Sequence, residues 1–335
     1  MIPGRIWSAR AGTPAYATGI VESYFVRINH PGGHWAAWIK HTFLVQKRTR
    51  ALSGACWFLL FDRTRTIVPS GVLAAREHFG EANVESAAGP GDILLGDNRL
   101  SESLCSGHIP ASGISWRFSH ASTGSPLVLA PATLSPLIPG TKLTTPVAEG
   151  YASGQLEFPG HILRFDNYPM SIGHNWGRRH ATRYAWAQAR TLSAEGRIFF
   201  EGFTLPLSGE FQDGPALTMA TLVLNGRTLS FSGLVSATRN RSRAVPGRLT
   251  MDLLNDRYTL NADFCWDDTL VAALRYPQPD RALSTCLCSM LASAVLVLTP
   301  TVSDAADARM RFEVPGTAAL EFLSPGPVPG RTVLA

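Results

Sequence analysis

The residues best suited to chemistry lie near the middle of the chain, between Ser171 and Arg190. Read as an extended chain, their side chains alternate between two faces with a period of two residues. One face is large, aromatic and able to form hydrogen bonds, while the other is mostly small. The first face carries His174, Trp176, Arg178, His180, Thr182, Tyr184, Trp186 and Gln188. We therefore expect a strand that lines a polar and aromatic pocket, with a buried join between two domains as the alternative role.

Imidazoles and aromatic rings are suited to proton-driven chemistry on an apolar molecule. Such a reaction needs a group that delivers the proton and surfaces that stabilise the resulting positive charge. His174 and His180 are candidates to deliver the proton. Trp176, Tyr184 and Trp186 are candidates to line the pocket, because aromatic faces attract cations.

Further candidates come from outside the central stretch. Glu22 begins the first predicted hairpin, and Glu157 precedes the turn that leads to the central strand. Either carboxylate could act as the acid or orient a histidine, and capping strand ends or pairing with arginines is the alternative role of both. A pocket between the two halves could also recruit Lys40. Trp38 and Asn175 are candidate ligand contacts, with core packing as the other role of Trp38.

The composition is that of a compact, turn-rich protein with few surface charges. Hydrophobic residues make up 45% of the 335 residues and charged residues only 16%, and the chain has 30 glycines and 23 prolines. Only three of the 30 basic residues are lysines, and the arginines are scattered along the chain. Because a nucleic-acid surface needs a clustered basic stripe, we expect no nucleic-acid partner.

The five cysteines form no CxxC pair, and their odd number leaves at least one unpaired. We expect reduced, mostly buried thiols and therefore a cytoplasmic protein. The N-terminus has no apolar signal region, and the longest apolar run, from Cys286 to Leu298, is too short to cross a bilayer. No transmembrane segment is expected; transient contact with a membrane and the oligomeric state stay open.

Short strands separated by turn residues dominate the sequence. The ranges 20–45, 184–205 and 217–232 each predict a hairpin, the last with an Asn-Gly tight turn. The range 71–79 is one of few helical candidates. Residues 126–146 contain five prolines, so we expect them to form an irregular crossing or lid over one end of the first domain.

Strands at such regular spacing are typical of barrels or sandwiches. Both halves of the chain begin with a long aromatic hairpin, which suggests duplication. We predict an all-β protein with few short helices, made of two antiparallel β-barrels packed together. The first barrel domain is expected to cover residues 1–170 and the second residues 171–335.

Motifs of several common enzyme classes are absent. The sequence contains no GxSxG, P-loop, GxGxxG or HExxH motif. The interpretation of this chain as a dinucleotide dehydrogenase, a kinase or a zinc protease therefore loses its main support. His174 and His180 lie too far apart on an extended strand to share a metal unless the chain bends at Gly177, and we expect no metal site.

Two parts of the chain resemble a known family. GHNWGRRH followed by YAWAQA, within residues 173–189, is similar to the mid-chain motif of lipocalin-like proteins related to hydroxyneurosporene synthase, a carotenoid hydratase, and tocopherol cyclase. The opening ESYFVRINHP and HWAAWIKHTF resembles the first hairpin of that family. Looser similarities, such as GYASGQLEFPG and CLCSMLASAVL, follow in the expected order over most of the chain.

The resemblance implies two lipocalin-like β-barrels that hold an apolar ligand in a barrel or between them. Characterised relatives include hydratases and cyclases of isoprenoids and cyclases of other natural products, which need no redox cofactor. Asp267 and Asp268, in FCWDDTLVAALRY, are candidates for the family's acidic catalytic position. A β-turn is their default structural role.

The sequence thus predicts a cofactor-independent enzyme of the lyase or isomerase class. It would act on a hydrophobic substrate, an isoprenoid or related natural product, by proton-initiated hydration, cyclisation or isomerisation in a pocket at the barrel junction. A non-catalytic carrier of an apolar ligand, of the lipocalin type, is the alternative. A protein whose central stretch is only a structural seam is the third reading.

Overall fold

The chain folds almost entirely into β-strands. In a computed structural model, the single α-helix of the described residues, α1 (Leu234–Arg239), has six residues. This confirms the prediction of an all-β protein with few short helices. None of the described helices is long and apolar enough to cross a membrane. The structure describes residues 19–84, 92–129, 141–206, 216–301, 308–328 and 333.

The first sheet has eleven antiparallel strands in the order β4-β3-β2-β1-β11-β10-β8-β7-β6-β5, with β9 paired to β10. Each strand pairs mainly with its neighbour in sequence, as in a meander, and β1 pairs with β11. The strands are β1 (Ile20–Asn29), β2 (Trp35–Val45), β3 (Leu52–Asp62), β4 (Val72–Phe79), β5 (Ile93–Leu95), β6 (Asn98–Leu100), β7 (Leu104–Ile109), β8 (Ile114–Ser122), β9 (Leu127–Val128), β10 (Thr141–Phe158) and β11 (His161–Gly177).

The second sheet has ten antiparallel strands in the order β15-β14-β13-β12-β21-β20-β18-β17-β16, with β19 paired to β20. It is arranged like the first sheet, because its first strand, β12, pairs with its last strand, β21. The strands are β12 (Tyr184–Ser193), β13 (Gly196–Pro206), β14 (Ala216–Leu224), β15 (Arg227–Ser230), β16 (Arg241–Val245), β17 (Arg248–Leu254), β18 (Tyr258–Cys265), β19 (Ala272–Pro277), β20 (Leu283–Pro300) and β21 (Met310–Pro325).

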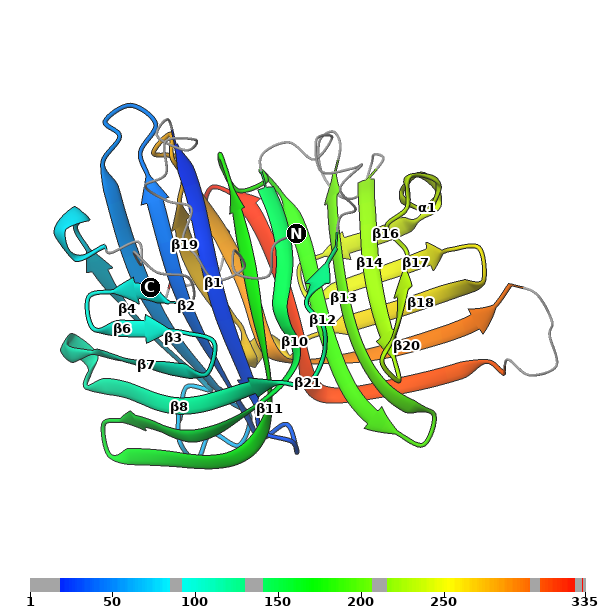
Figure 1. The fold of residues 1–335 in the computed structure, drawn as a ribbon, viewed down its shortest axis with the longest axis horizontal. Coiled ribbons are helices and arrows are strands. Elements are labelled where there is room, and N and C mark those ends of the chain that lie inside the picture. The colour runs from blue at the N-terminus through cyan, green and yellow to red at the C-terminus, as the bar shows by residue number, and fades with distance from the viewer. Residues whose placement is uncertain are drawn as a thin grey trace.

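Each sheet curls until its two ends approach one another. Strand β4 contacts β7 in the first sheet, and β14 contacts β16 in the second. The result is two tandem antiparallel barrels side by side, with β20 of the second barrel lying against β1, β2 and β3 of the first (Figure 1). The three hairpins expected at 20–45, 184–205 and 217–232 are confirmed.

Strand β1 is a wall shared by the first barrel and the seam between the barrels. All ten of its residues are buried. Because side chains alternate along a strand, Tyr24 and Val26 point into the first barrel, where they join its core. Phe25 points the other way and packs with residues of the second barrel.

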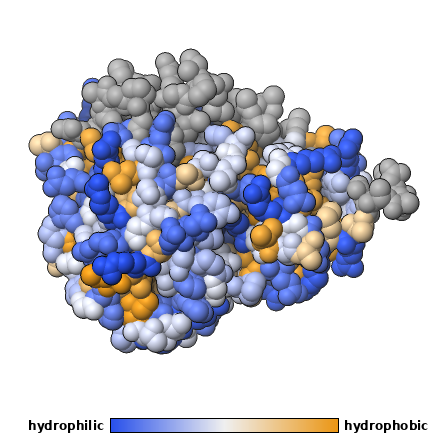
Figure 2. Space-filling view, turned by 60° about the horizontal axis from the view of Figure 1, so that its bottom comes forward, coloured by the Kyte–Doolittle hydropathy of each residue, from blue (hydrophilic) through white to orange (hydrophobic). Residues whose placement is uncertain are grey.

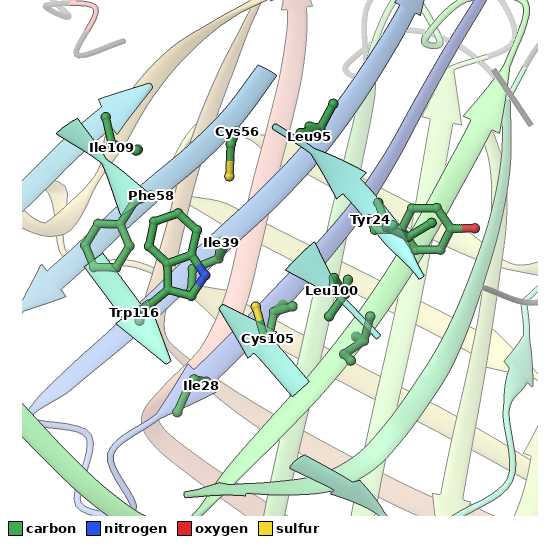
Figure 3. Close-up of a cluster of buried hydrophobic side chains, with 14 of the residues drawn as sticks. Tyr24, Ile28, Ile39, Cys56, Phe58, Leu95, Leu100, Cys105, Ile109 and Trp116 are labelled. Carbon is green, nitrogen blue, oxygen red and sulfur yellow. The ribbon is translucent and has the colours of Figure 1, made fainter. Parts of the chain in front are cut away.

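The inside of the first barrel is filled with large side chains. Ten of them, labelled in Figure 3, converge from β1, β2, β3 and the strands β5 to β8. Phe58 and Trp116 stack at the centre with ring centroids 5.8 Å apart. A lipocalin holds its ligand in such an interior; here protein side chains occupy it.

The seam between the barrels has its own apolar core. Trp38 and Trp57 from the first barrel pack there with Trp186, Phe203 and other residues of the second. A smaller cluster joins Leu127 and Ala148 to Phe199 and Val223. Side-chain to backbone hydrogen bonds cross the seam as well, from Asn29 to the Met290 carbonyl (2.8 Å) and from Arg63 to the Leu291 carbonyl (2.8 Å).

Two expectations about local structure are wrong. The range 71–79 is not helical but forms β4, because pairing with the long buried strand β3 outweighs the weak helical preference of its residues. The stretch 171–190 is not one strand: β11 ends at Gly177 and β12 begins at Tyr184. The residues between them include bends, so the alternation of faces is interrupted.

The chain passes from the first sheet to the second between Gly177 and Tyr184. The sequence placed the domain division after residue 170, which lies within β11. That division stays a prediction. The expected proline-rich lid lies largely outside the described residues, and from Thr141 the chain is already in β10. All five cysteines are free, and only Cys265 is exposed.

The visible surface is mostly hydrophilic, with hydrophobic residues in separate small patches (Figure 2). The exposed large hydrophobic residues are accordingly few and distant from one another along the chain. Among the described residues they are Val128, Ile162, Leu192, Val235 and Leu283. Scattered residues of this kind are normal on a folded protein.

Close packing at Gly173 predicts a measurable stability effect. A Cβ at Gly173 would lie 2.1 Å from the Phe25 ring, which is itself held between Trp38 and Trp186. We expect Gly173→Ala to lower the free energy of unfolding by about 1–3 kcal/mol, as overpacking does, in urea titrations. In the control Gly80→Ala, nothing lies within 4 Å of the added Cβ; an equal loss in both variants would contradict this account of the seam.

Candidate functional site

A small pocket lies in the seam, between the two barrels. Its volume is about 30 Å³, enough for a single water. Strands of both barrels supply its walls, which combine aromatic rings with four polar or ionisable side chains besides Tyr184. The lining residues are Phe25, Trp38, Lys40, Leu143, Asn175, His180, Tyr184, Trp186, Phe203 and Glu321.

Lys40 is a charged residue buried in an aromatic setting. It points from β2 into the seam and is only 2% exposed. Its Nζ lies 3.9 Å from the centre of the Tyr276 ring and 5.3 Å from that of Trp38. Burial lowers the pKa of Lys40, and the Glu321 carboxylate opposes that shift. Burying an ammonium costs several kcal/mol, which the aromatic faces offset only in part.

A tyrosine and a carboxylate form the second polar group of the pocket. The Tyr184 hydroxyl, at the start of β12, donates a short hydrogen bond to Glu321 on the neighbouring strand β21. Burial and the nearby Glu321 carboxylate raise the pKa of Tyr184 well above its usual value. Tyr184 therefore stays protonated at neutral pH and can pass its proton only along this hydrogen bond or to a ligand.

His180 lies on the segment between β11 and β12, and its ring faces the same pocket. Its backbone N–H donates to the Gln278 side chain at 3.0 Å, which fixes this part of the segment. Burial, and then the charge of Lys40, lower the pKa of His180 to about 3. The imidazole is therefore neutral at physiological pH, which argues against its expected role as an imidazolium proton donor.

Two polar atoms of the pocket are available for a ligand. The Asn175 Oδ1 and the Trp38 Nε1 are buried and have no hydrogen-bond partner among the described residues. An unsatisfied buried polar atom costs about 1–3 kcal/mol. A ligand that brings one donor and one acceptor to the pocket would recover that free energy.

Trp186 connects the pocket to a buried carboxylate behind it. Its Nε1 donates to Glu201 Oε1 at 3.1 Å, and Thr145 donates to Glu201 Oε2 at 2.6 Å. Burial raises the pKa of Glu201, although these hydrogen bonds oppose the shift. The indole is thereby held with one face toward the pocket.

His174 and Glu22 form a separate polar cluster inside the first barrel. His174 Nε2 and Glu22 Oε1 are 2.8 Å apart and both side chains are buried. The imidazole stacks between Tyr24 (3.9 Å) and Trp176 (4.5 Å). This pair thus faces the barrel core, whereas His180 faces the junction pocket, because the chain leaves the strand after Gly177.

His41 is a further buried histidine on that side, close to Tyr24 in the strand register. Neither of its ring nitrogens has a partner among the described residues. Burial lowers its pKa to about 4, so this imidazole too is neutral at physiological pH.

The three remaining acidic candidates, Glu157, Asp267 and Asp268, lie apart from the pocket. Asp267 caps an exposed turn, where it accepts hydrogen bonds from Thr269. Glu157 is near the far end of β10, where Ser115 and Gln155 donate to it. Asp268 is exposed on the short turn before β19 and accepts from the Trp266 indole at 3.1 Å. Their assignment as catalytic residues stays a prediction without support from this geometry.

The structure brings six of the expected residues together and adds four that the sequence analysis missed. Lys40, Asn175, His180, Tyr184, Trp186 and Trp38 all line the junction pocket. Glu321, Phe25, Leu143 and Phe203 are the additions. Glu321 had a visible signal, because it is a lone carboxylate in the apolar run AALEFL, but its partner Tyr184 is 137 residues away.

Comparison with known proteins bears on the fold. No family model and no curated protein sequence matches the chain. Similar crystal structures do exist. A candidate AttH from Nitrosomonas europaea aligns with a TM-score of 0.55 at 12% identity, over 91% of this chain and 92% of that one. The fold is the tandem lipocalin-like barrel.

Two further structures share this fold. Kievitone hydratase from Nectria haematococca has a TM-score of 0.55 at 10% identity, over 96% of this chain and 93% of that one. CghA has a TM-score of 0.56 at 13% identity, over 92% of this chain and 88% of that one. At such sequence identities the similarity establishes the architecture alone. The chemistry has to be argued from the residues of the site.

The burial of Lys40 predicts a stability difference that depends on pH. At pH 7 we expect Lys40→Met to unfold with a free energy about 1–4 kcal/mol higher than the wild type. Because the pKa of Lys40 is lowered in the folded state, the folded wild type loses its proton before the unfolded chain does. Wild-type stability then rises with pH up to the unfolded pKa of about 10.4, so the advantage of the variant shrinks.

Urea titrations at pH 7 and pH 10 measure this difference. Lys142→Met is the matched control, because Lys142 is exposed on β10, and it should change stability by less than about 0.5 kcal/mol. A Lys40→Met variant that is less stable than the wild type at pH 7 would show that the rings and Glu321 more than offset the cost of burial.

Proposed function

We propose that this protein is a cofactor-independent enzyme that transfers protons to and from a hydrophobic substrate in the junction pocket. The reaction would be a hydration, cyclisation or isomerisation of an isoprenoid or related natural product. The walls of the pocket would have to move apart to admit it, because the closed pocket holds a single water. One observation carries the proposal: Lys40, Tyr184 and Glu321 are buried together against aromatic rings. Buried ionisable groups with shifted pKa values in a cleft are characteristic of catalytic sites.

Lys40 and Glu321 divide the proton transfer between them, and Tyr184 holds Glu321 by its hydrogen bond. The Lys40 ammonium donates a proton to one carbon of a double bond and becomes a neutral amine. The aromatic faces of Trp38 and Trp186, together with Glu321, stabilise the positive charge that appears on the substrate. In an isomerisation or cyclisation the substrate then loses a proton to Glu321. In a hydration the attacking water loses its proton to Glu321. Transfer of this proton from Glu321 to the Lys40 amine restores the ammonium.

The acidity of the donor limits which double bonds can react. An alkylammonium, even with a lowered pKa, is a much weaker acid than a carboxylic acid. It suits protonation of the enolate carbon that forms when water adds to a double bond conjugated with a carbonyl better than protonation of an isolated alkene, because efficient proton transfer requires matched pKa values. The Trp38 indole N–H is available to donate a hydrogen bond to such a carbonyl oxygen.

The comparisons support the proposal at the level of the fold. One structural neighbour is a hydratase by name, and the central motif resembles the hydroxyneurosporene synthase family. Since one fold serves many reactions, the argument depends on the pocket residues. The four buried free thiols support a cytoplasmic location, which is part of the proposal.

A non-catalytic carrier is the alternative, and one observation limits it. Side chains fill the first barrel where a lipocalin would hold its ligand. The core of the second barrel is filled as well, so a carried ligand would lie between the barrels, in the junction pocket or in another hollow of the seam. The two functions differ in whether the ligand leaves chemically changed.

Mass spectrometry in heavy water tests the proposal. The purified protein is incubated with a hydrophobic metabolite extract, in water and in deuterium oxide. Hydration adds about 18 Da to a component, whereas isomerisation or cyclisation leaves its mass unchanged but shifts its retention time and adds about 1 Da in deuterium oxide. Lys40→Met should lower the rate of conversion by about a hundredfold or more.

Variants of the neighbouring groups sharpen the test. Tyr184→Phe keeps the ring but removes the proton that the hydroxyl shares with Glu321, so we expect a smaller loss of rate. Lys142→Met serves again as the control and should retain full activity. Recovery of the bound ligand unchanged after long incubation would instead support the carrier. Full activity of Lys40→Met would rule out the proton donor proposed for this pocket.

A further inference from the structure

A second and larger hollow lies along the same seam. It is a groove of about 460 Å³. The strands that form the junction pocket continue into it: β1 supplies Phe25 to the pocket and Arg27 to the groove, and β12 supplies Trp186 to the pocket and Arg190 to the groove. Among the groove residues that the structure describes are three arginines and a histidine but no aspartate or glutamate.

Arg27 is a buried cation that forms no ion pair with a carboxylate among the described residues. Its side chain points into the seam and is 4% exposed. Its Nη1 donates one long hydrogen bond, 3.5 Å, to the Thr317 carbonyl, and its Nε has no partner among the described residues. Burial, and then the charge of Arg190, lower the pKa of Arg27 to about 9. A guanidinium has five donors, and the structure gives Arg27 this one hydrogen bond.

Arg190 adds a second cation, which forms no ion pair with a carboxylate among the described residues, although Glu149 attracts it electrostatically. Its Nη1 donates to the Gly150 carbonyl at 2.7 Å, and its guanidinium lies 4.5 Å from the centre of the Tyr151 ring. These contacts fix the side chain and leave its remaining N–H groups for a ligand. Arg197, in contrast, is paired with Glu149 at 3.2 Å.

The nearest carboxylate behind the groove cancels only part of this charge. Glu201 attracts Arg27 electrostatically but already accepts hydrogen bonds from Thr145, Trp186 and Gln188. Together with Glu149, which pairs with Arg197, it offsets two of the three arginine charges of the groove. The groove therefore retains positive charge in a partly desolvated place, where an anion gains most.

Part of the groove wall is apolar, although Asn167, Ser171 and Thr191 also line it. Ala148, Met170, Leu192, Phe199 and Pro315 line it beside the arginines. A purely inorganic anion would leave these surfaces in contact with water. A ligand with an anionic head and an apolar body would cover both kinds of surface.

We propose that this groove is a binding site for an amphipathic oxyanion, held by Arg27 and Arg190 through its carboxylate or phosphate group and by the apolar wall through its hydrocarbon body. The planar guanidinium groups match the two oxygens of such a head group. The site is distinct from the junction pocket and does not depend on the function proposed for it.

Isothermal titration calorimetry with three eight-carbon probes tests the site. Octanoate, octyl phosphate and octanol have hydrocarbon bodies of seven or eight carbons and differ in the head group. We expect at least one anion to bind at least about tenfold more tightly than octanol, and the tighter anion identifies the head group. Equal affinities for the anions and the alcohol, or no binding of either anion up to about 1 mM, would overturn the proposal.

Variants locate the binding. Arg190→Gln should weaken binding of the tighter anion about tenfold and leave octanol unaffected, whereas Arg190→Lys should cause a smaller loss because it keeps the charge but not the fork. Arg27→Gln should act in the same direction, and circular dichroism would report whether it folds. Arg248→Gln, an exposed arginine paired with Asp263, is the control. Unchanged affinity in Arg190→Gln would also overturn the proposal.

Discussion

The packing of the two barrels against each other is the contact on which the rest of the structure depends. Strand β20 lies across β1, β2 and β3, and the large aromatic residues of both sheets interlock there. Both hollows described above exist only because two curved surfaces cannot fit together over their whole length. Any change that loosens the seam would alter both at once, without touching the hydrogen bonds within either sheet.

The seam differs from an ordinary protein core in the number of polar groups it holds. Two cations, Lys40 and Arg27, and the carboxylates of Glu201 and Glu321 are all buried within it. A continuous set of hydrogen bonds runs from Ser171 through Gln188 and Glu201 to Trp186. Because Ser171 lines the groove and Trp186 lines the pocket, the two sites share one buried network.

Much of the architecture was predictable because it depends on local signals. Alternating residues and tight turns such as Asn225-Gly226 define the hairpins, and antiparallel pairing follows from their short connections. The sequence could not show that 71–79 is a strand, since only the presence of β3 beside it decides between two weak preferences. Nor could it show where the chain bends after Gly177, which separates His174 from His180.

The composition of the site was predictable only in part, for a physical reason. Residues that share a strand, such as Tyr184 and Trp186, follow from the period of two. Glu321 and Phe203 reach the pocket through strand order in the second sheet, and strand order is a property of the whole chain. The sequence identified the right segment but could not identify which distant strands face it.

The double role of β1 has a consequence for how this protein can vary. Insertion or deletion of one residue would turn every side chain of the strand to its opposite face. Tyr24 would then enter the seam, and Phe25 and Arg27 would enter the first barrel. Homologues should accordingly vary in length at the hairpin ends and in β5 to β7, far from the seam, while β1 keeps its length and its alternation. In this fold, the alternation of side chains along β1 determines which residues enter the first barrel, the junction pocket and the groove.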